Sequence, residues 1–125
     1  MNTGLILFAH GARDPRWAAP FESVAAEVRQ QQAQTCVQLA FLEFMQPNLP
    51  DAAAQLVQRG CKQIDVLPMF LGSGGHVRQD LPKLLEQIQA TYPTVCIRLH
   101  PAIGEMSSVT SAMARAAVQV LGDRA

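Results

Sequence analysis

The chain has 125 residues, of which 49% are hydrophobic and 16% are charged, a balance typical of a folded globular protein. Ten basic and ten acidic residues give a formal net charge of zero, which argues against the basic surface of a nucleic-acid-binding protein. No apolar run approaches the roughly 20 residues that cross a bilayer, and residues 1–4 lack the features of a signal peptide. We therefore expect one domain over residues 1–125, without a membrane partner and located in the cytoplasm.

Four short apolar runs predict β-strands. The first run, residues 5–9, is continuous rather than alternating, which is typical of a strand covered on both faces of a parallel sheet. The expected strands are residues 5–9, 36–42, 64–70 and 95–99.

Apolar residues recur every three or four positions after each of these runs, which predicts four helices. Asp14-Pro15 marks the entry to the first helix, Pro50 opens the second and Gly60 ends it. Asp80 and Pro82 are expected in the first turn of the third helix. The fourth helix carries its apolar face at Val109, Met113, Ala116, Ala117 and Val120. The order β-α-β-α-β-α-β-α predicts an α/β, flavodoxin-like fold with a four-stranded parallel sheet and helices on both faces.

Chemically active side chains follow the expected strands. His10 comes directly after the first strand, Glu43 follows the second, and His76 follows the third behind a glycine-rich stretch. Because ligands of open parallel sheets bind at the carboxyl ends of the strands, we expect these side chains at one edge. Imidazole and carboxylate groups suit cobalt, iron, nickel and zinc, and imidazole also accepts protons. The pattern predicts a site for a divalent metal, with His100 nearby and expected to be structural.

A second group of residues is expected at the same edge. The glycines of residues 72–75 match no nucleotide-binding motif and instead allow a flat ligand to approach the backbone. Arg13 and Arg78 either pair with ligand carboxylates or are solvated surface charges. Phe44, Met45 and Phe70 either pack on a ligand or, as we expect, pack in the core. The candidate substrate-binding residues are Arg13, Phe44, Ser73, Gly74, Gly75 and Arg78.

The three cysteines, Cys36, Cys61 and Cys96, lie far apart in the chain and include no CxxC pair. Their number and spacing argue against both a disulfide framework and a zinc ribbon. We expect all three to be small buried apolar residues.

Three segments resemble, in the correct order, the motifs of the short sirohydrochlorin chelatases, the CbiX-type members of the class II chelatases. Residues 8–15 (FAHGARDP) resemble the opening motif, residues 41–49 the second, and residues 67–82 the third, which is the longest and most specific. Ala12 stands where many relatives have serine, and Ser73 where many have proline or alanine. Neither difference removes a metal ligand.

The resemblance implies a lyase that inserts a divalent metal, Co²⁺ or else Fe²⁺ or Ni²⁺, into sirohydrochlorin in cobalamin or sirohaem biosynthesis. It implies His10 and His76 as the metal-handling histidines, and Glu43 as a further ligand or proton acceptor. It also implies a class II chelatase half-unit and a symmetric homodimer whose carboxyl-end faces form the cavity. The metal is a substrate of this reaction, and no organic cofactor is expected.

Three other functions share some of these features. A non-catalytic metal or tetrapyrrole carrier would share every ligand and differ only in lacking turnover. A histidine phosphatase would need an arginine before His10-Gly11, where this chain has Ala9. A flavodoxin-like signalling module would need an acidic cluster or a flavin loop, and the sequence has neither.

Overall fold

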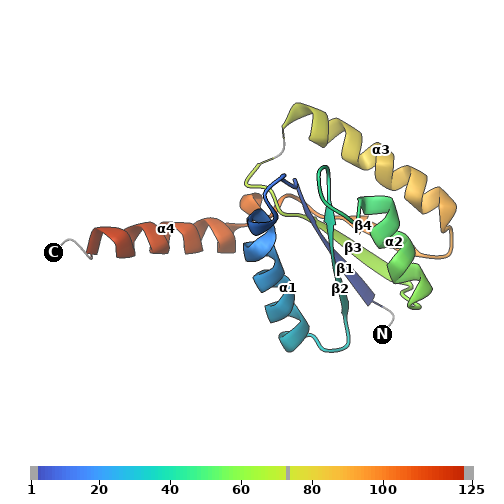
Figure 1. The fold of residues 1–125 in the computed structure, drawn as a ribbon, viewed down its shortest axis with the longest axis horizontal. Helices are drawn as coiled ribbons and strands as arrows, with labels where there is room; N and C mark the ends of the chain where they lie inside the picture. The colour runs from blue at the N-terminus through green and yellow to red at the C-terminus, as the bar shows by residue number, and fades with distance from the viewer. Residues whose placement is uncertain (1–2, 73, 123–125) are drawn as a thin grey trace.

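The structure, a computed structural model, describes residues 3–72 and 74–122 and has a four-stranded parallel sheet at its centre (Figure 1). The strands lie in the order β2-β1-β3-β4, and every neighbouring pair is parallel. Each strand begins and ends within two residues of the range predicted from the sequence, which confirms the predicted α/β fold. The strands are β1 (Thr3–Ala9), β2 (Cys36–Phe41), β3 (Gln63–Pro68) and β4 (Cys96–Leu99).

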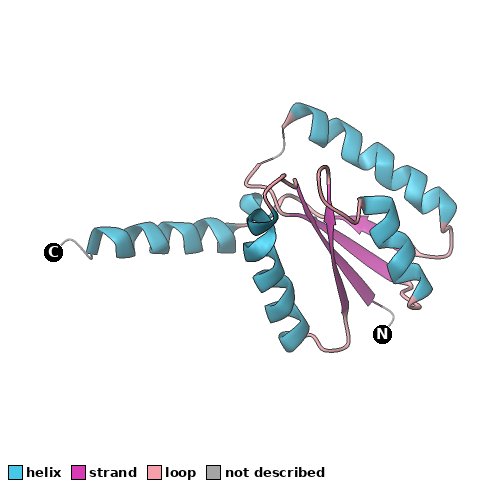
Figure 2. Cartoon of the chain, in the orientation of Figure 1, coloured by secondary structure: helices cyan, strands magenta, loops and turns pink. Residues whose placement is uncertain are grey.

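Helices cover both faces of the sheet, as predicted (Figure 2). The first helix packs mainly on β1 and β2 on one face, and the second and third lie on the opposite face. The fourth helix extends away from the rest of the molecule (Figure 1) and buries none of its residues. No helix in the described part of the chain is long and apolar enough to span a membrane. The helices are α1 (Ala19–Gln31), α2 (Leu49–Gln58), α3 (Gly75–Thr91) and α4 (Ser107–Gly122), with short 3-10 helices η1 (Pro15–Ala18) and η2 (Ile103–Glu105).

The core is divided by the sheet into two apolar layers. Successive side chains of a strand point to opposite faces, so Ile6 and Phe8 of β1 enter the layer under α2 and α3. Leu7 enters the layer under α1, where it packs near Ala25 and Val37. β1 is therefore apolar along most of its length because both of its faces are covered.

The third helix begins earlier than the sequence predicted. Gly74 is its N-cap and Gly75 its first residue, so residues 76–78 lie in the first turn rather than in a loop, and Pro82 lies inside the helix. Proline removes one main-chain hydrogen bond, but its fixed φ is compatible with a helix. Leu81 and Leu85 on either side of Pro82 are buried in the core, and this burial offsets the lost bond.

Cys96 is exposed, so the prediction that all three cysteines are buried is wrong at this position. Cys36 and Cys61 are buried in the core as expected. Cys96 lies on β4, an edge strand, and its neighbours Arg98 and Leu99 are exposed as well. The reason is that α1 lies over β1 and β2 and leaves this end of the sheet with little cover.

Leu56 of α2 tests the main core layer, because its side chain is fully buried and lies against Gly4 of β1. We expect Leu56→Ala to lower the free energy of unfolding by about 2–5 kcal/mol, since the substitution leaves a cavity. Urea unfolding followed by circular dichroism measures this change. The matched control is Leu71→Ala, whose side chain is 72% exposed and whose effect should stay within about 0.5 kcal/mol. Equal losses in the two variants would contradict the assigned core.

Candidate active site

His10 and Glu43 lie side by side at the carboxyl ends of β1 and β2. The Nε2 atom of His10 is 3.2 Å from Oε1 of Glu43. The main chain holds them together, because the pairing of the two strands continues beyond their ends. The N–H of Leu42 donates to the carbonyl of Ala9 (2.9 Å), and the N–H of Glu43 donates to the carbonyl of His10 (3.1 Å). The structure thus brings two of the three predicted metal-handling side chains into contact.

Gly11 allows the loop after β1 to approach the loop after β2 this closely. Its φ is +94°, a conformation that residues with a side chain rarely adopt. A Cβ atom at this position would also overlap the main-chain carbonyl oxygen of Glu43. Gly11 is therefore required both by its own backbone and by the position of Glu43.

The His10–Glu43 pair is open to solvent on one side and supported on the other. The two side chains are 53% and 49% exposed, so a ligand can reach both. The ring of Phe70 packs edge-to-face against the imidazole, with centroids 6.1 Å apart and planes at 68°. Phe70 itself packs against the core, which restricts how the His10 ring can turn. The pair offers one nitrogen and one oxygen donor in a partly fixed arrangement.

Arg13 and Phe44 form a stacked pair in the loops that follow the same two strands. The guanidinium carbon of Arg13 lies 5.0 Å from the centroid of the Phe44 ring, a cation–π contact. Phe44 is 58% exposed, so the expectation that it packs in the core is wrong. Its φ of 67° is a left-handed conformation that residues with a side chain rarely adopt. Met45 and Phe70, in contrast, do pack against core clusters as expected.

The remaining predicted residues lie in the segment that leads into α3. Ser73 and the side chains of His76 and Arg78 lie outside the described residues, although the main chain of residue 76 is in the first turn of α3. Gly74 and Gly75 are exposed, and a Cβ atom at either would meet nothing within 4 Å. Packing within the protein does not require glycine here, so these positions leave open space beside the first turn of a helix.

His100 lies on a different surface from the pair. Its Nε2 atom is 2.8 Å from Oδ1 of Asp65, and Nε of Arg98 donates to the same oxygen at 2.9 Å. Burial raises the pKa of the Asp65 carboxyl, but hydrogen bonds from His100, Arg98 and Gln63 outweigh burial, so the pKa is lowered overall. The carboxylate is thus ionised at neutral pH and holds both side chains across β3 and β4. This arrangement accords with the structural role expected for His100.

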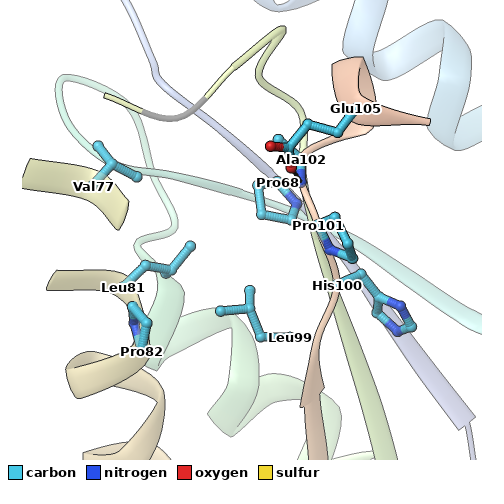
Figure 3. Close-up of a pocket in the computed structure, with 9 residues that line it drawn as sticks. All are labelled: Pro68, Val77, Leu81, Pro82, Leu99, His100, Pro101, Ala102 and Glu105. Carbon is cyan, nitrogen blue, oxygen red and sulfur yellow. Dashed lines mark hydrogen bonds between the residues drawn. The ribbon is translucent and has the colours of Figure 1, made fainter. Parts of the chain in front are cut away.

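A cavity of about 360 Å³ lies between α3 and the segment that follows β4 (Figure 3). Its walls are mostly apolar, and the imidazole of His100 points away from the side chains of α3. The carboxylate of Glu105 accepts a hydrogen bond from the N–H of Ala102 (3.1 Å). Neither His10 nor Glu43 lines this cavity, so we do not assign it to metal chemistry. The lining residues are Pro68, Val77, Leu81, Pro82, Leu99, His100, Pro101, Ala102 and Glu105.

Exposed apolar side chains at the carboxyl ends of β2 and β3 were missed by the sequence analysis. Leu42 is 43% exposed just after β2, and Leu71 is 72% exposed in the loop after β3. With Phe44 they give this edge of the sheet apolar surface that the protein itself does not cover. Nothing in the sequence distinguishes these residues from buried ones, because each continues an apolar run.

Among the side chains that the structure describes, no group of three or more histidine, cysteine or acidic residues could hold a metal ion. The His10–Glu43 pair supplies two donors, and the side chain of His76 is not among those described. A metal bound by the pair would therefore keep coordination positions for other donors.

The profile of the CbiX family matches residues 4–120, a range that includes both members of the pair and all of the strands except Thr3 of β1. This chain belongs to the CbiX family. The CbiX-family match extends into α4 and thus takes in nearly the whole fold.

Relatives of this CbiX-family chain include two archaeal proteins named sirohydrochlorin cobaltochelatase. The protein of Methanocaldococcus jannaschii is 33% identical over 85 residues, which cover 68% of this chain and 59% of the relative. That of Saccharolobus solfataricus is 32% identical over 84 residues, which cover 66% and 62%. The chain therefore matches less than two thirds of the length of each.

Solved structures also resemble this CbiX-family chain. A CbiX protein of Marinobacter aquaeolei VT8, assigned to cobalamin (vitamin B12) biosynthesis, superposes with a TM-score of 0.84 and 31% identity, covering 98% of this chain and 99% of that one. The sirohydrochlorin chelatase SirB of Bacillus subtilis subspecies spizizenii, in complex with cobalt, gives a TM-score of 0.71 at 25% identity. That match covers 90% of this chain and 48% of SirB, so the fold corresponds to about half of the larger protein.

Two glycines with positive φ allow the role of Gly11 to be tested against a matched control. Gly11→Ala is expected to displace Glu43, whereas Gly60→Ala, at a φ of +90° with open space around it, adds backbone strain alone. Gly11→Ala should therefore lower the free energy of unfolding by at least about 1 kcal/mol more than Gly60→Ala. Urea unfolding measures the stability, and NMR of the His10 ring should show a shift only in Gly11→Ala. The same loss in both variants, with an unchanged His10 ring, would show that Gly11 does not position Glu43.

Proposed function

We propose that this chain inserts a divalent metal ion, Co²⁺ in the first place, into sirohydrochlorin. The observation that carries the proposal is the exposed pair of His10 and Glu43, 3.2 Å apart at the carboxyl ends of two neighbouring strands. Membership of the CbiX family supports it, as do the relatives named sirohydrochlorin cobaltochelatase. The cobalt-bound structure of SirB supports the choice of metal.

The donor set suits a metal that must be released again. Imidazole and carboxylate bind borderline divalent ions without the strong hold of a thiolate. Cys36 and Cys61 are buried in the core, and Cys96 lies on the edge strand at the opposite end of the sheet from β2. We assign His10, Glu43 and His76 to the metal, with His76 as the donor from the first turn of α3.

The reaction forms bonds between the metal and the ring nitrogens and releases two N–H protons from the ring. His10 and Glu43 can serve both needs, because one of the pair can hold the metal while the other accepts the two ring protons in turn and releases each to solvent. A neutral imidazole and a carboxylate are both bases of suitable strength. Binding the ring and the metal ion in a fixed relative position converts their bimolecular encounter into an intramolecular step. The contact of His10 with Phe70 keeps the nitrogen donor aligned.

The surroundings of the pair fit a flat ring that carries carboxylates. Leu42, Phe44 and Leu71 present exposed apolar surface at the ends of β2 and β3, which suits the face of a macrocycle. Arg13, stacked on Phe44, is available to pair with a ring carboxylate. We assign Arg78 and the main chain of residues 73–75 to the same substrate, because they follow β3 at this edge.

The rate of sirohydrochlorin metallation with Co²⁺ tests the proposal directly, since the absorption spectrum of the ring changes as the metal enters. We expect wild type to turn over, and His10→Ala, His76→Ala and Glu43→Gln to lose about a hundredfold or more in rate. His100→Ala is the control, because His100 is bound to Asp65 and should keep most of the activity. Binding of the ring by wild type without turnover would replace the chelatase with a carrier.

Arg13 is expected to contribute to substrate affinity rather than to the chemical step. Arg13→Ala should raise KM for sirohydrochlorin about tenfold and leave kcat nearly unchanged, because a carboxylate contact is made equally in the ground and transition states. Steady-state kinetics separates the two constants. The matched control is Arg16→Ala, whose guanidinium is paired with Asp14 at 2.9 Å and should matter little. A fall in kcat with unchanged KM would contradict this role.

A further inference from the structure

The two edge strands of the sheet, β2 and β4, differ in how their outward-facing main-chain groups are covered. At β2 the guanidinium of Arg29 donates to the carbonyl of Val37 (2.9 Å). The side-chain amide of Gln38 donates to the carbonyl of Leu39 (3.1 Å), and the N–H of Phe41 donates to a carbonyl of the following loop (2.9 Å). An open row of such groups is a template for pairing with another strand, and at β2 the protein's own groups occupy these positions.

One part of the outer edge of β4 is covered in a similar way by Gln89 of α3. The side-chain amide of Gln89 donates to the carbonyl of Val95 (2.6 Å), and its oxygen accepts from the N–H of Ile97 (3.2 Å). A residue of a parallel strand would bond the same two groups, because it donates to one residue and accepts from the residue two positions further on. The Gln89 amide therefore stands where the main chain of a fifth parallel strand would begin.

The rest of the outer edge of β4 is open. The N–H groups of Cys96 and His100 donate inward, on the β3 side, so the main-chain groups of Ile97 and Leu99 point outward. In the part of the chain that the structure describes, nothing bonds the carbonyl of Ile97 or either main-chain group of Leu99. The next outward residue, Pro101, has no N–H, so the edge ends there. The open edge thus offers one donor between two acceptors.

An apolar groove runs beside this open edge, between β4 and α3. Two cavities of about 360 Å³ each share Pro82 and Leu99, and we call them together the α3–β4 groove. Figure 3 shows the first cavity, in which the side chain of Leu99 projects toward Leu81 and Pro82. The second cavity is lined by Pro82, Leu85, Glu86, Gln89, Ile97 and Leu99. Leu99 is 39% exposed, so the groove opens to solvent at the edge of the strand.

The alternation of side chains along a strand fixes which residues of an added strand would face the groove. A residue paired with Arg98 would share its face of the sheet, on the side of α1. The side chain of Arg98 is 55% exposed and donates to Asp65 through Nε, so an acidic side chain beside it can bond the outer guanidinium nitrogens. The residues before and after would face α3 and enter the two cavities of the groove, which suits apolar side chains.

We propose that β4 accepts an extended segment of another protein as a fifth, parallel strand, with an apolar, an acidic and a second apolar residue in a row. The N–H of the acidic residue donates to the carbonyl of Ile97, and its carbonyl accepts from the N–H of Leu99. Main-chain bonds of this kind give affinity, and the groove selects the side chains. Neither His10 nor Glu43 lines the groove, and the proposal does not depend on the proposed function.

Titration of the ¹⁵N-labelled protein with end-blocked peptides tests the proposal by NMR. The probes are Thr-Val-Glu-Val-Thr and its versions with isoleucine, leucine or phenylalanine in place of the valines. We expect at least one to bind with a Kd below about 1 mM and to slow hydrogen exchange of the Leu99 N–H. Methylation of the glutamate main-chain nitrogen should weaken binding about tenfold, because it removes the bond to Ile97. No binding by any probe, or binding that this methylation leaves unchanged, would overturn the proposal.

Two variants at one position test the donor on the protein side. Leu99→Pro removes the outward N–H, and an edge strand tolerates proline at such a position. Leu99→Ala is the matched control, because it also loses the side chain but keeps the N–H. With both variants folded by circular dichroism, we expect the peptide to bind Leu99→Pro about tenfold more weakly than Leu99→Ala. Equal affinities would contradict strand addition.

A second copy of this chain is the competing occupant of the edge. Hydrogen exchange of the Leu99 N–H is therefore measured without peptide over a range of protein concentrations. We expect fast exchange that does not depend on concentration. Exchange that slows as the protein concentration rises would show that copies of the chain pair through β4, and it would overturn the proposal of a peptide partner.

Discussion

The site depends on the main-chain pairing of β1 and β2 beyond the ends of the strands. After β2, the N–H groups of Leu42 and Glu43 donate to the carbonyls of Ala9 and His10. These bonds place the Glu43 carboxylate against the His10 imidazole. The contact is possible only because Gly11 has no side chain. The pair is thus positioned by backbone geometry, and its side chains remain free to exchange a ligand.

Stability and chemistry lie in separate parts of the molecule. The buried apolar residues beneath the loops, such as Ile6, Phe8 and Leu56, hold the sheet and helices together. The candidate functional side chains lie in loops at the carboxyl ends of the strands, where they remain solvated. Phe70 connects the two parts, because it packs on the core and supports the ring of His10.

The sequence predicts the sheet and places His10 and Glu43 at one edge of it, because both predictions follow from local patterns. Continuous apolar runs mark the strands, and a polar residue directly after a strand lies at its carboxyl end. α3 starts earlier than predicted because proline is typical of a first turn, whereas the buried neighbours of Pro82 allow it within the helix. Periodicity also predicts that α4 has an apolar face but not what covers it. The exposure of Cys96 follows from the position of α1, which lies over β1 and β2 and leaves β4 with little cover.

X-ray absorption at the cobalt edge of the Co²⁺-loaded protein tests the central claim, that this edge of the sheet binds the metal through His10. The account predicts a first shell of nitrogen and oxygen with imidazole scattering, part of which is lost in His10→Ala. A sulfur shell, or a spectrum that is the same in wild type and His10→Ala, would contradict it.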